Sequence, residues 1–312
     1  MRLVFLGTPE FAVPSLERLV AAGHDIAAVV TQPDRPKGRG QQVAPPPVKL
    51  AAQRLGLPVH QPERIRNPEA VAMLAALQPQ GMVVVGYGQL IPQTVIDLAP
   101  LGIINVHASL LPKYRGAAPV QWAIARGETV TGVTTMRIDA GLDTGDILLQ
   151  RATPIGPDET AIELSERLAV MGADLLVETL RGLESGAIVP QAQDHSQATY
   201  APLLKKEDGW IDWRRPAAEV YNKIRGFLPW PGAWTRFRGK LLHIWKARPT
   251  AISSQGPAGA LATAHGKLTA ICGDGAALEL TEVQLEGKKR ISGQDFLNGY
   301  QPADGERLGE PA

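Results

Sequence analysis

Three polar side chains in two short stretches of this sequence are suited to act together in chemistry. Asn105 and His107 are two residues apart at the end of an expected strand, so they project to the same side of a sheet. Asp143 lies between two glycines in a turn, where its carboxylate can approach the histidine. An amide stabilises an oxyanion, an imidazole acts as general acid or base, and a carboxylate holds the imidazole in place. The three residues therefore predict a catalytic site.

Each of these residues also has an ordinary structural interpretation. A single asparagine at a strand end is more often a turn residue, and a single histidine is more often a hydrogen-bonded structural group. Asp143 and Asp146 are both suited to plain turn formation. Only the combination of the three types in one cleft favours catalysis.

The elements that must position these residues follow an alternating pattern. Short apolar runs alternate with amphipathic segments over the first half of the chain, with runs at 2–7, 24–31, 82–88 and 103–109 and segments at 13–23 and 46–56. This rhythm is typical of an α/β fold with a doubly wound, mostly parallel sheet and helices on both faces. Ligands bind at the carboxyl ends of such strands, where Asn105 and His107 are expected. We predict one such domain over residues 1–189.

The pattern changes in the second half of the chain. Thr160 precedes one long helical stretch ending at Gly186, and segment 190–208 lacks periodicity, which predicts a linker with little core. A helix from Pro216 to Gly226 and then strand-like pieces between glycine turns predict a C-terminal OB-like β-barrel domain over residues 209–312. We expect about three of its five tryptophans in the barrel core; the five are Trp210, Trp213, Trp230, Trp234 and Trp245.

The two polar motifs resemble those of the folate-dependent formyltransferase family. Its hallmark, Asn-x-His-x-Ser-Leu-Leu-Pro followed by Asp-x-Gly-x-Asp-x-Gly, matches residues 105–112 and 139–145. The resemblance implies a formyltransferase-like Rossmann variant in which Asn105, His107 and Asp143 are catalytic. It also implies 10-formyltetrahydrofolate as the formyl donor, without a metal. The implied folate-binding residues are Gly86, Tyr87, Gly88, Gln89, Leu90, Ile91, Ser109, Leu110, Leu111, Pro112 and Asp139.

These folate residues fit the chemistry of a pterin. A flat pterin needs apolar walls and backbone hydrogen bonds, which exposed loops with leucines such as Leu90 and Leu110 supply. The alternative is that the leucines are ordinary core residues.

Basic residues favour an RNA acceptor within this family. The loop 31–49 is rich in Pro, Gly and basic residues, and it resembles the insertion with which tRNA-formylating members contact the initiator acceptor stem. Residues 205–248 hold eleven Lys or Arg against four Asp or Glu, although the net charge of the chain is only +1. The resemblance implies methionyl initiator tRNA as the partner. The expected tRNA contacts are Arg35, Lys37, Arg39, Lys205, Lys206, Arg236, Arg238, Lys288, Lys289 and Arg290.

Length and composition exclude several classes of protein. A chain of 312 residues that is 44% hydrophobic and 20% charged has room for two globular domains. Its single cysteine, Cys272, cannot form an internal disulfide. The first apolar run stops at Gly7 and Pro9, too early for a signal peptide or a membrane span. The resemblance implies a one-carbon transferase of translation initiation, and together with these features it leads us to expect a monomeric, cytoplasmic enzyme.

Three alternatives are weaker. A formyltransferase acting on an amino-sugar nucleotide would have a different C-terminal module. A non-catalytic RNA-binding protein on the same scaffold would lack at least one of Asn105, His107 and Asp143. A nicotinamide-dependent dehydrogenase is disfavoured because Gly7 is not followed by the second and third glycines of the dinucleotide-binding motif.

Overall fold

The chain folds into two compact units. The computed structural model describes residues 1–37, 42–253, 256–263 and 266–309. The first unit comprises Met1–Gly116, Thr131–Pro154 and Ser165–Tyr200. The second unit comprises Ala117–Val130, Ile155–Leu164 and Ala201–Ala312. Each unit combines three separate stretches of the chain, so this division does not test single boundaries. The predicted domain boundaries at 189 and 209 stay a prediction.

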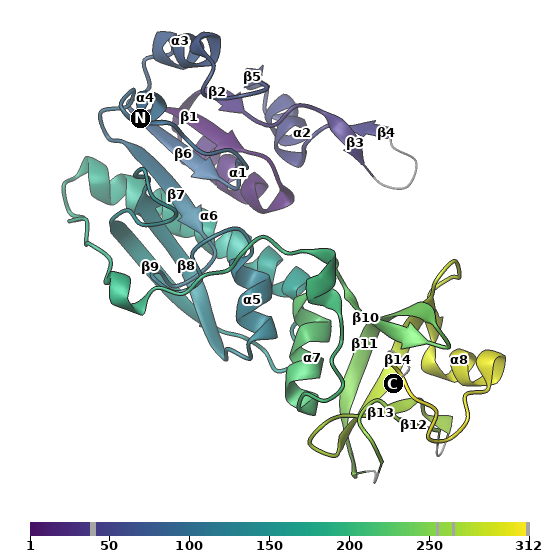
Figure 1. Ribbon diagram of the computed structural model, residues 1–312. Helices are drawn as coiled ribbons and strands as arrows, with labels where there is room; N and C mark the ends of the chain where they lie inside the picture. Colours follow the sequence, from purple (N-terminus) through teal and green to yellow (C-terminus); the bar gives the residue numbers. More distant parts are fainter. Residues whose placement is uncertain (38–41, 254–255, 264–265, 310–312) are drawn as a thin grey trace. The chain divides into compact units, whose positions relative to one another are not determined.

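A seven-stranded sheet forms the centre of the first unit, in the order β5-β2-β1-β6-β7-β8-β9 (Figure 1). Neighbouring strands from β5 to β7 are parallel, whereas β8 is antiparallel to β7. The predicted mostly parallel sheet is thus confirmed. The strands are β1 Arg2–Gly7, β2 Asp25–Val30, β5 Val59–His60, β6 Gly81–Val85, β7 Ile103–His107, β8 Val130–Arg137 and β9 Ile147–Pro154.

Helices cover both faces of this sheet, as the alternating pattern predicts. On one face, Leu74 of α3 and Val95 near the end of α4 belong to a buried cluster with strand side chains. On the other face α6 lies close to the sheet, because a Cβ added at Gly172 would meet Val106 and Val133. The helices are α1 Val13–Ala21, α2 Pro47–Arg54, α3 Pro68–Ala76, α4 Gln93–Ile96 and α6 Ala161–Glu184.

Helix α6 confirms the predicted long helix. At its start, the Thr160 amide donates to Glu163 Oε2 at 2.8 Å and the Glu163 amide donates to Thr160 Oγ1 at 3.3 Å, which is a capping box. Beyond its end, Gly186 has φ +70°, the left-handed conformation that commonly terminates helices. No helix in the described ranges, α6 included, is long and apolar enough to cross a membrane.

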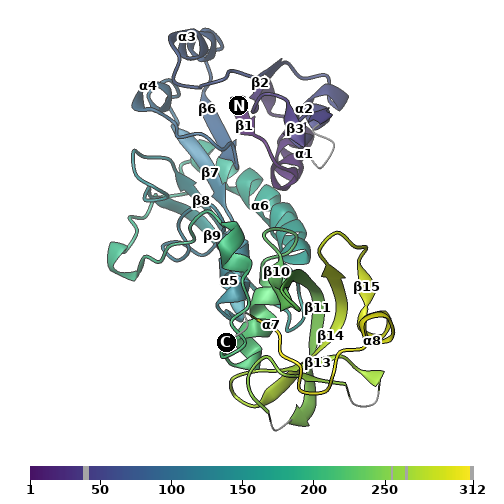
Figure 2. The same ribbon diagram turned by 45° about the vertical axis from the view of Figure 1, so that its right-hand side comes forward.

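The second unit is built around an antiparallel sheet in the order β10-β11-β14-β13-β12, with β15 paired to β14 (Figure 2). The long strands β11 and β14 carry most of the pairing, and register shifts along them bend the sheet. This curled antiparallel sheet agrees with the predicted barrel-like domain. Its elements are α5 Pro119–Ala125, α7 Ala217–Gly226, β10 Ala233–Phe237, β11 Lys240–Ser253, β12 Leu261–Ala262, β13 Thr269–Ile271, β14 Ala276–Leu285, β15 Ile291–Ser292 and α8 Gly293–Tyr300.

Fewer tryptophans enter the core of this unit than expected. Of the five, only Trp213 is buried, at 4% exposure, and its Nε1 donates to Thr235 Oγ1. Trp230 is 53% exposed, and the remaining three are half-buried. The expectation was wrong because aliphatic side chains and phenylalanine fill the interior, while the indole N–H groups of Trp234 and Trp245 reach polar partners at its edge.

The segment 190–208 contributes more buried surface than a plain linker. Gln193 is 6% exposed, and Leu204 packs in a buried cluster with Ala118 and Phe227 of the second unit. These side chains occur singly rather than at a helical or strand period, so the sequence pattern did not reveal them.

Candidate active site

The end of β7 presents the predicted amide and imidazole. Asn105 and His107 are 8% and 6% exposed, and they face the opposite side of the sheet from Val106, which lies beneath α6. Parallel pairing with β6 and antiparallel pairing with β8 fix the strand in register, with Asn105 opposite Val84 and Met136. No hydrogen bond holds the Asn105 amide among the described residues. The amide is thus available to a substrate.

His107 is oriented by the backbone carbonyl of Tyr114. Its Nε2 lies 2.9 Å from Tyr114 O, and because a carbonyl only accepts, Nε2 carries the proton. The other ring nitrogen, Nδ1, lies 3.7 Å from Asp143 Oδ2. The neutral ring therefore has its acceptor nitrogen on the side of Asp143, and the protonated ring has a donor there.

Asp143 is held in a tight turn beside the histidine. Its Oδ2 accepts a hydrogen bond from the Gly116 amide at 2.8 Å, and its side chain is 16% exposed. Its φ of +52° is left-handed, a conformation that aspartate tolerates better than most residues. The structure thus brings His107 and Asp143 together as the sequence predicts, at a separation that is longer than a hydrogen bond. Catalytic hydrogen bonds are often long without substrate and tighten when it binds.

Two residues of this region escaped the sequence analysis. Arg115 is buried and bonds Gln193, whose amide donates to the backbone of the acidic turn. Arg115 lies between the two motifs in the chain, only three residues after the first, and that position is the one signal that could have found it. Gln193 is 50 residues from Asp143 in the chain, and nothing in its sequence surroundings signals the contact.

The predicted folate segments differ in how their side chains are placed. Leu90 is 86% exposed and Leu142, next to Asp143, is 53% exposed, which leaves both available as apolar walls. Leu111, in contrast, is buried; its amide donates to Thr134 Oγ1 at 3.1 Å, and its carbonyl accepts from Gln150. Leu110, Ile91 and Pro112 are half-buried.

Polar residues of the same segments are mostly engaged within the protein. Ser109 Oγ donates to Lys113 O at 2.6 Å, Gln89 bridges Glu63 and Ile65, and Asp139 accepts from Gly141 and Thr144. These bonds fix the loops. Gly86 has φ +57°, and a Cβ there would lie 2.9 Å from Pro9 Cγ, so this loop position requires glycine.

Tyr87 lies in the core rather than in an open pocket. Its ring is 1% exposed, and burial raises the pKa of its phenol to about 12. The hydroxyl has no hydrogen-bond partner among the described residues, although the Tyr87 carbonyl accepts from Thr8 and Gln32.

Substitution Tyr87→Phe should raise the free energy of unfolding by about 1 kcal/mol, because it removes a buried hydroxyl that is unpaired. Chemical denaturation of both proteins measures the change. Folate titration should give the same affinity for both, since the hydroxyl lies in the apolar cluster. A marked loss of folate affinity in the variant would instead make the phenol a ligand-binding group.

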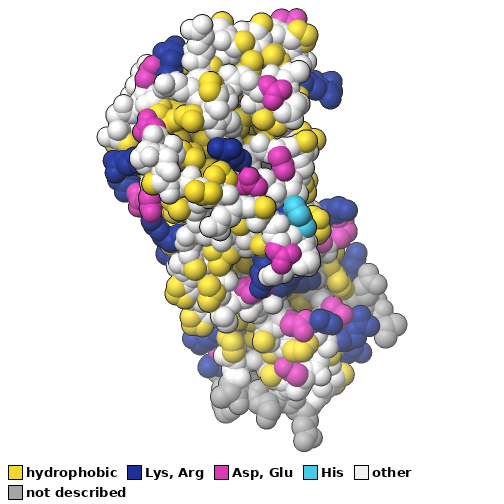
Figure 3. Space-filling model, turned by 90° about the vertical axis from the view of Figure 1, so that its left-hand side faces the viewer, with side chains coloured by type: hydrophobic (Ala, Val, Ile, Leu, Met, Phe, Trp, Pro, Cys, Tyr) yellow, Lys and Arg dark blue, Asp and Glu magenta, His cyan; other side chains and the backbone are white. Residues whose placement is uncertain are grey.

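The predicted basic residues fall into two groups. Arg238 is paired with Glu306, and Arg290 is paired with Glu282 while stacking on Trp245. The others that the structure describes are exposed and form no ion pair within the described ranges: Arg35, Lys205, Lys206, Arg236, Lys288 and Lys289. Arg39 and the side chain of Lys37 lie outside the described residues. On the face in Figure 3, acidic and basic side chains are interspersed.

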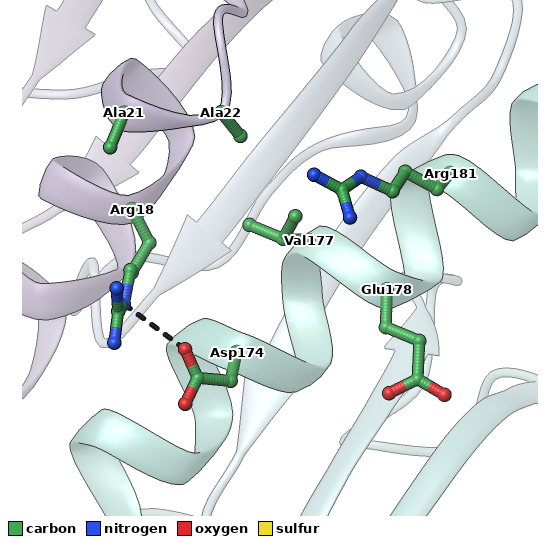
Figure 4. A pocket seen from close by; sticks show the side chains of 7 residues that line it. All are labelled: Arg18, Ala21, Ala22, Asp174, Val177, Glu178 and Arg181. Atoms are coloured by element: carbon green, nitrogen blue, oxygen red, sulfur yellow. Dashed lines mark ion pairs between the residues drawn. The ribbon is translucent and has the colours of Figure 1, made fainter.

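A separate hollow of about 490 Å³ lies between α1 and α6 and contains none of the predicted site residues (Figure 4). Its rim carries an ion pair of 3.0 Å between Arg18 and Asp174. Charges of both signs line it, from Arg18, Arg181, Asp174 and Glu178. Its lining offers neither a nucleophile nor an imidazole, so we assign it no part in the reaction.

Comparison with known proteins gives a consistent picture. The family described as "Formyl transferase" matches residues 1–180, and "Formyl transferase, C-terminal domain" matches residues 203–301. The chain is 65% identical to a methionyl-tRNA formyltransferase of Solibacter usitatus and 60% identical to one of Koribacter versatilis, each alignment covering 99% of both chains.

Solved structures with low sequence identity share the fold. An N-formyltransferase from Helicobacter canadensis, in complex with folinic acid and dTDP-3-aminofucose, is similar with a TM-score of 0.67 at 19% identity, over 89% of this chain and 98% of that one. HypX from Aquifex aeolicus, in complex with tetrahydrofolic acid, has a TM-score of 0.64 at 18% identity, over 97% of this chain and 48% of that one.

Proposed function

The chain belongs to the formyl transferase family, among its methionyl-tRNA formyltransferases, and we propose that it moves the formyl group of 10-formyltetrahydrofolate to the amino group of methionyl initiator tRNA. The observation that carries the proposal is 65% identity over the full length, together with an Asn105, His107 and Asp143 set at the end of β7. We further propose that the enzyme is a cytoplasmic monomer.

The geometry supports a defined division of work between the three residues. Attack of the neutral amine on the formyl carbon produces a tetrahedral intermediate with a negative oxygen. The Asn105 amide and protonated His107 stabilise this oxygen. Because Nε2 of His107 is bound to Tyr114 O, the ring can offer only Nδ1 to the reaction. Asp143 balances the imidazolium and helps to move the proton from the attacking amine to the departing folate nitrogen.

The folate segments are proposed to hold the donor. Exposed Leu90 and Leu142 are suited to wall a flat ring, and the rigid backbone of the loop 86–92 and of the Ser-Leu-Leu-Pro run offers polar groups at fixed positions. Bound there, the folate supplies the activated formyl group. The assignment of each residue to folate is a proposal and rests on the family motifs.

A transfer assay tests the proposed function. Purified enzyme is mixed with 10-formyltetrahydrofolate carrying a radiolabelled formyl group and with methionyl initiator tRNA, and labelled tRNA is counted. Parallel reactions contain methionyl elongator tRNA or an amino-sugar nucleotide. We expect label mainly on initiator tRNA. Label on the sugar nucleotide alone, or on no acceptor with a folded enzyme, would contradict the proposal.

Lys288 and Lys289, which form no ion pair with any described residue, are proposed to contact tRNA phosphates. The double variant Lys288→Ala, Lys289→Ala should reduce the slope of log affinity against log salt by about two, roughly one for each phosphate that is no longer bound. Its melting temperature should not change, because both side chains are exposed. Arg248→Ala is the control, since Arg248 is already paired with Glu279 at 3.0 Å. An unaltered slope in the double variant would remove these lysines from the tRNA surface.

A further inference from the structure

The short segment 114–116 supports both members of the proposed acid–base pair. Tyr114 O accepts a hydrogen bond from His107 Nε2, and the Gly116 amide donates to Asp143 Oδ2. Between them, Arg115 is 2% exposed. The backbone of this segment fixes two catalytic groups. The proposed mechanism assigns no role to the Arg115 side chain between them.

Arg115 is a buried cation that has no carboxylate partner in the part of the chain that the structure describes. Within the described ranges it forms no ion pair, and its guanidinium instead donates to Gln193 Oε1, from Nε at 3.2 Å and from Nη2 at 2.7 Å. Nη2 also lies 3.0 Å from His195 Nδ1. Burial of a cation is unfavourable unless it gains strong hydrogen bonds, and a charged donor makes stronger bonds than a neutral one. Arg115 therefore orients the Gln193 amide firmly.

The orientation of Gln193 follows from this contact. Its oxygen must face the arginine, so its Nε2 points the other way, where it donates to Asp143 O at 2.9 Å and to Gly145 O at 2.7 Å. The backbone of Gln191 is bonded to Ile147 in both directions, at 2.8 and 2.9 Å, which anchors the segment to the start of β9. Gln193 therefore bonds the turn from a segment whose backbone is itself held to β9.

The two carbonyls that accept hydrogen bonds from Gln193 lie in the turn that contains Asp143. Asp143 has φ +52°, and the carbonyls of residues 143 and 145 follow it in the turn. Held in this way, the turn keeps Oδ2 near His107 Nδ1 and within reach of the Gly116 amide. A shift of about 1 Å in a catalytic group can reduce a rate about 100-fold.

We infer that Gln193, oriented by buried Arg115, is a positioning residue that sets Asp143 against His107 in the formyl-transfer reaction. This inference rests on the proposed function. Gln193 itself touches no reacting atom; it acts through the backbone of the turn. Its effect should therefore appear chiefly in turnover, with a smaller effect on folate binding because Leu142 of the same turn is proposed to contact the donor.

Steady-state formyl transfer by full-length Gln193→Met tests the inference, because methionine fills similar space and removes both donated hydrogen bonds. We expect kcat to fall about 10- to 100-fold while KM for each substrate changes less than about threefold. Gln197→Met is the matched control, since Gln197 is exposed and donates to Asp194 in the same segment. It should behave as the wild type.

A double variant separates positioning from a general loss of structure. In the Asp143→Ala background, Gln193→Met should lower kcat less than about twofold further, because the carboxylate it positions is already absent. Independent, multiplicative losses would overturn the inference, as would an unchanged kcat in Gln193→Met or a change confined to KM. If Gln193→Met unfolds, Arg115→Lys, which keeps a cation but weakens the orientation of Gln193, should show the same loss, chiefly in kcat. A wild type that transfers no formyl group would instead refute the proposed function.

Discussion

Alanine at Asn105 or His107 should lower kcat for formyl transfer by about 100- to 1000-fold, the usual effect of removing one oxyanion-stabilising group. The two variants should differ in stability. The Asn105 amide has no side-chain hydrogen bond among the described residues, so its loss removes little. Loss of His107 removes the buried hydrogen bond from its Nε2 to Tyr114 O, which contributes about 0.5–1.5 kcal/mol.

Single-turnover kinetics and chemical denaturation of both variants measure these effects separately. Asp143→Ala should show a similar kinetic loss, and Asp146→Ala serves as its control because Asp146 has no proposed part in the chemistry. Near-normal turnover in His107→Ala would make the assigned chemistry wrong. A kinetic loss that disappears when stability is restored by lower temperature would assign the residue to folding and not to catalysis.

The fold was largely predictable because its determinants are local. Alternating apolar runs and amphipathic segments predicted the parallel sheet, and Thr160 and Gly186 marked both ends of α6. The sequence did not predict that α5 belongs to the second unit although the first unit flanks it in the chain. Its packing against α7 joins residues almost one hundred positions apart, and the sequence pattern of neither helix indicates which helix it packs against.

The site was predictable to the extent that it follows the chain. Two residues on one strand face must point the same way, so Asn105 and His107 were found from their spacing. Their supports were not, because they depend on backbone groups. Tyr114 and Gly116 contribute a carbonyl and an amide, which every residue type except proline has. Gln193 could be recognised only once the turn existed to accept its hydrogen bonds.

The last glycine of the acidic motif has a steric reason that the sequence could not show. A Cβ on Gly145 would lie 2.0 Å from the carbonyl oxygen of Arg137 and 2.9 Å from its carbon, both of them backbone atoms. The Arg137 amide is itself bonded to Asp146 O at 2.9 Å, so neither side of this turn can move alone. Gly145→Ala should therefore displace the whole turn that carries Asp143. We expect a loss of about 1–3 kcal/mol in stability and of about 100-fold in kcat.

Thermal denaturation and formyl-transfer kinetics of Gly145→Ala provide the measurement, with Gly299→Ala as the matched control. Gly299 lies in α8, and a Cβ there meets nothing within 4 Å, so alanine should raise stability by roughly 1 kcal/mol through its helix propensity. The contrast matters because both changes add the same methyl group. If Gly145→Ala kept full turnover, the turn would tolerate displacement, and the position of Asp143 relative to His107 would not limit the reaction. Loss of stability without loss of turnover would lead to the same conclusion.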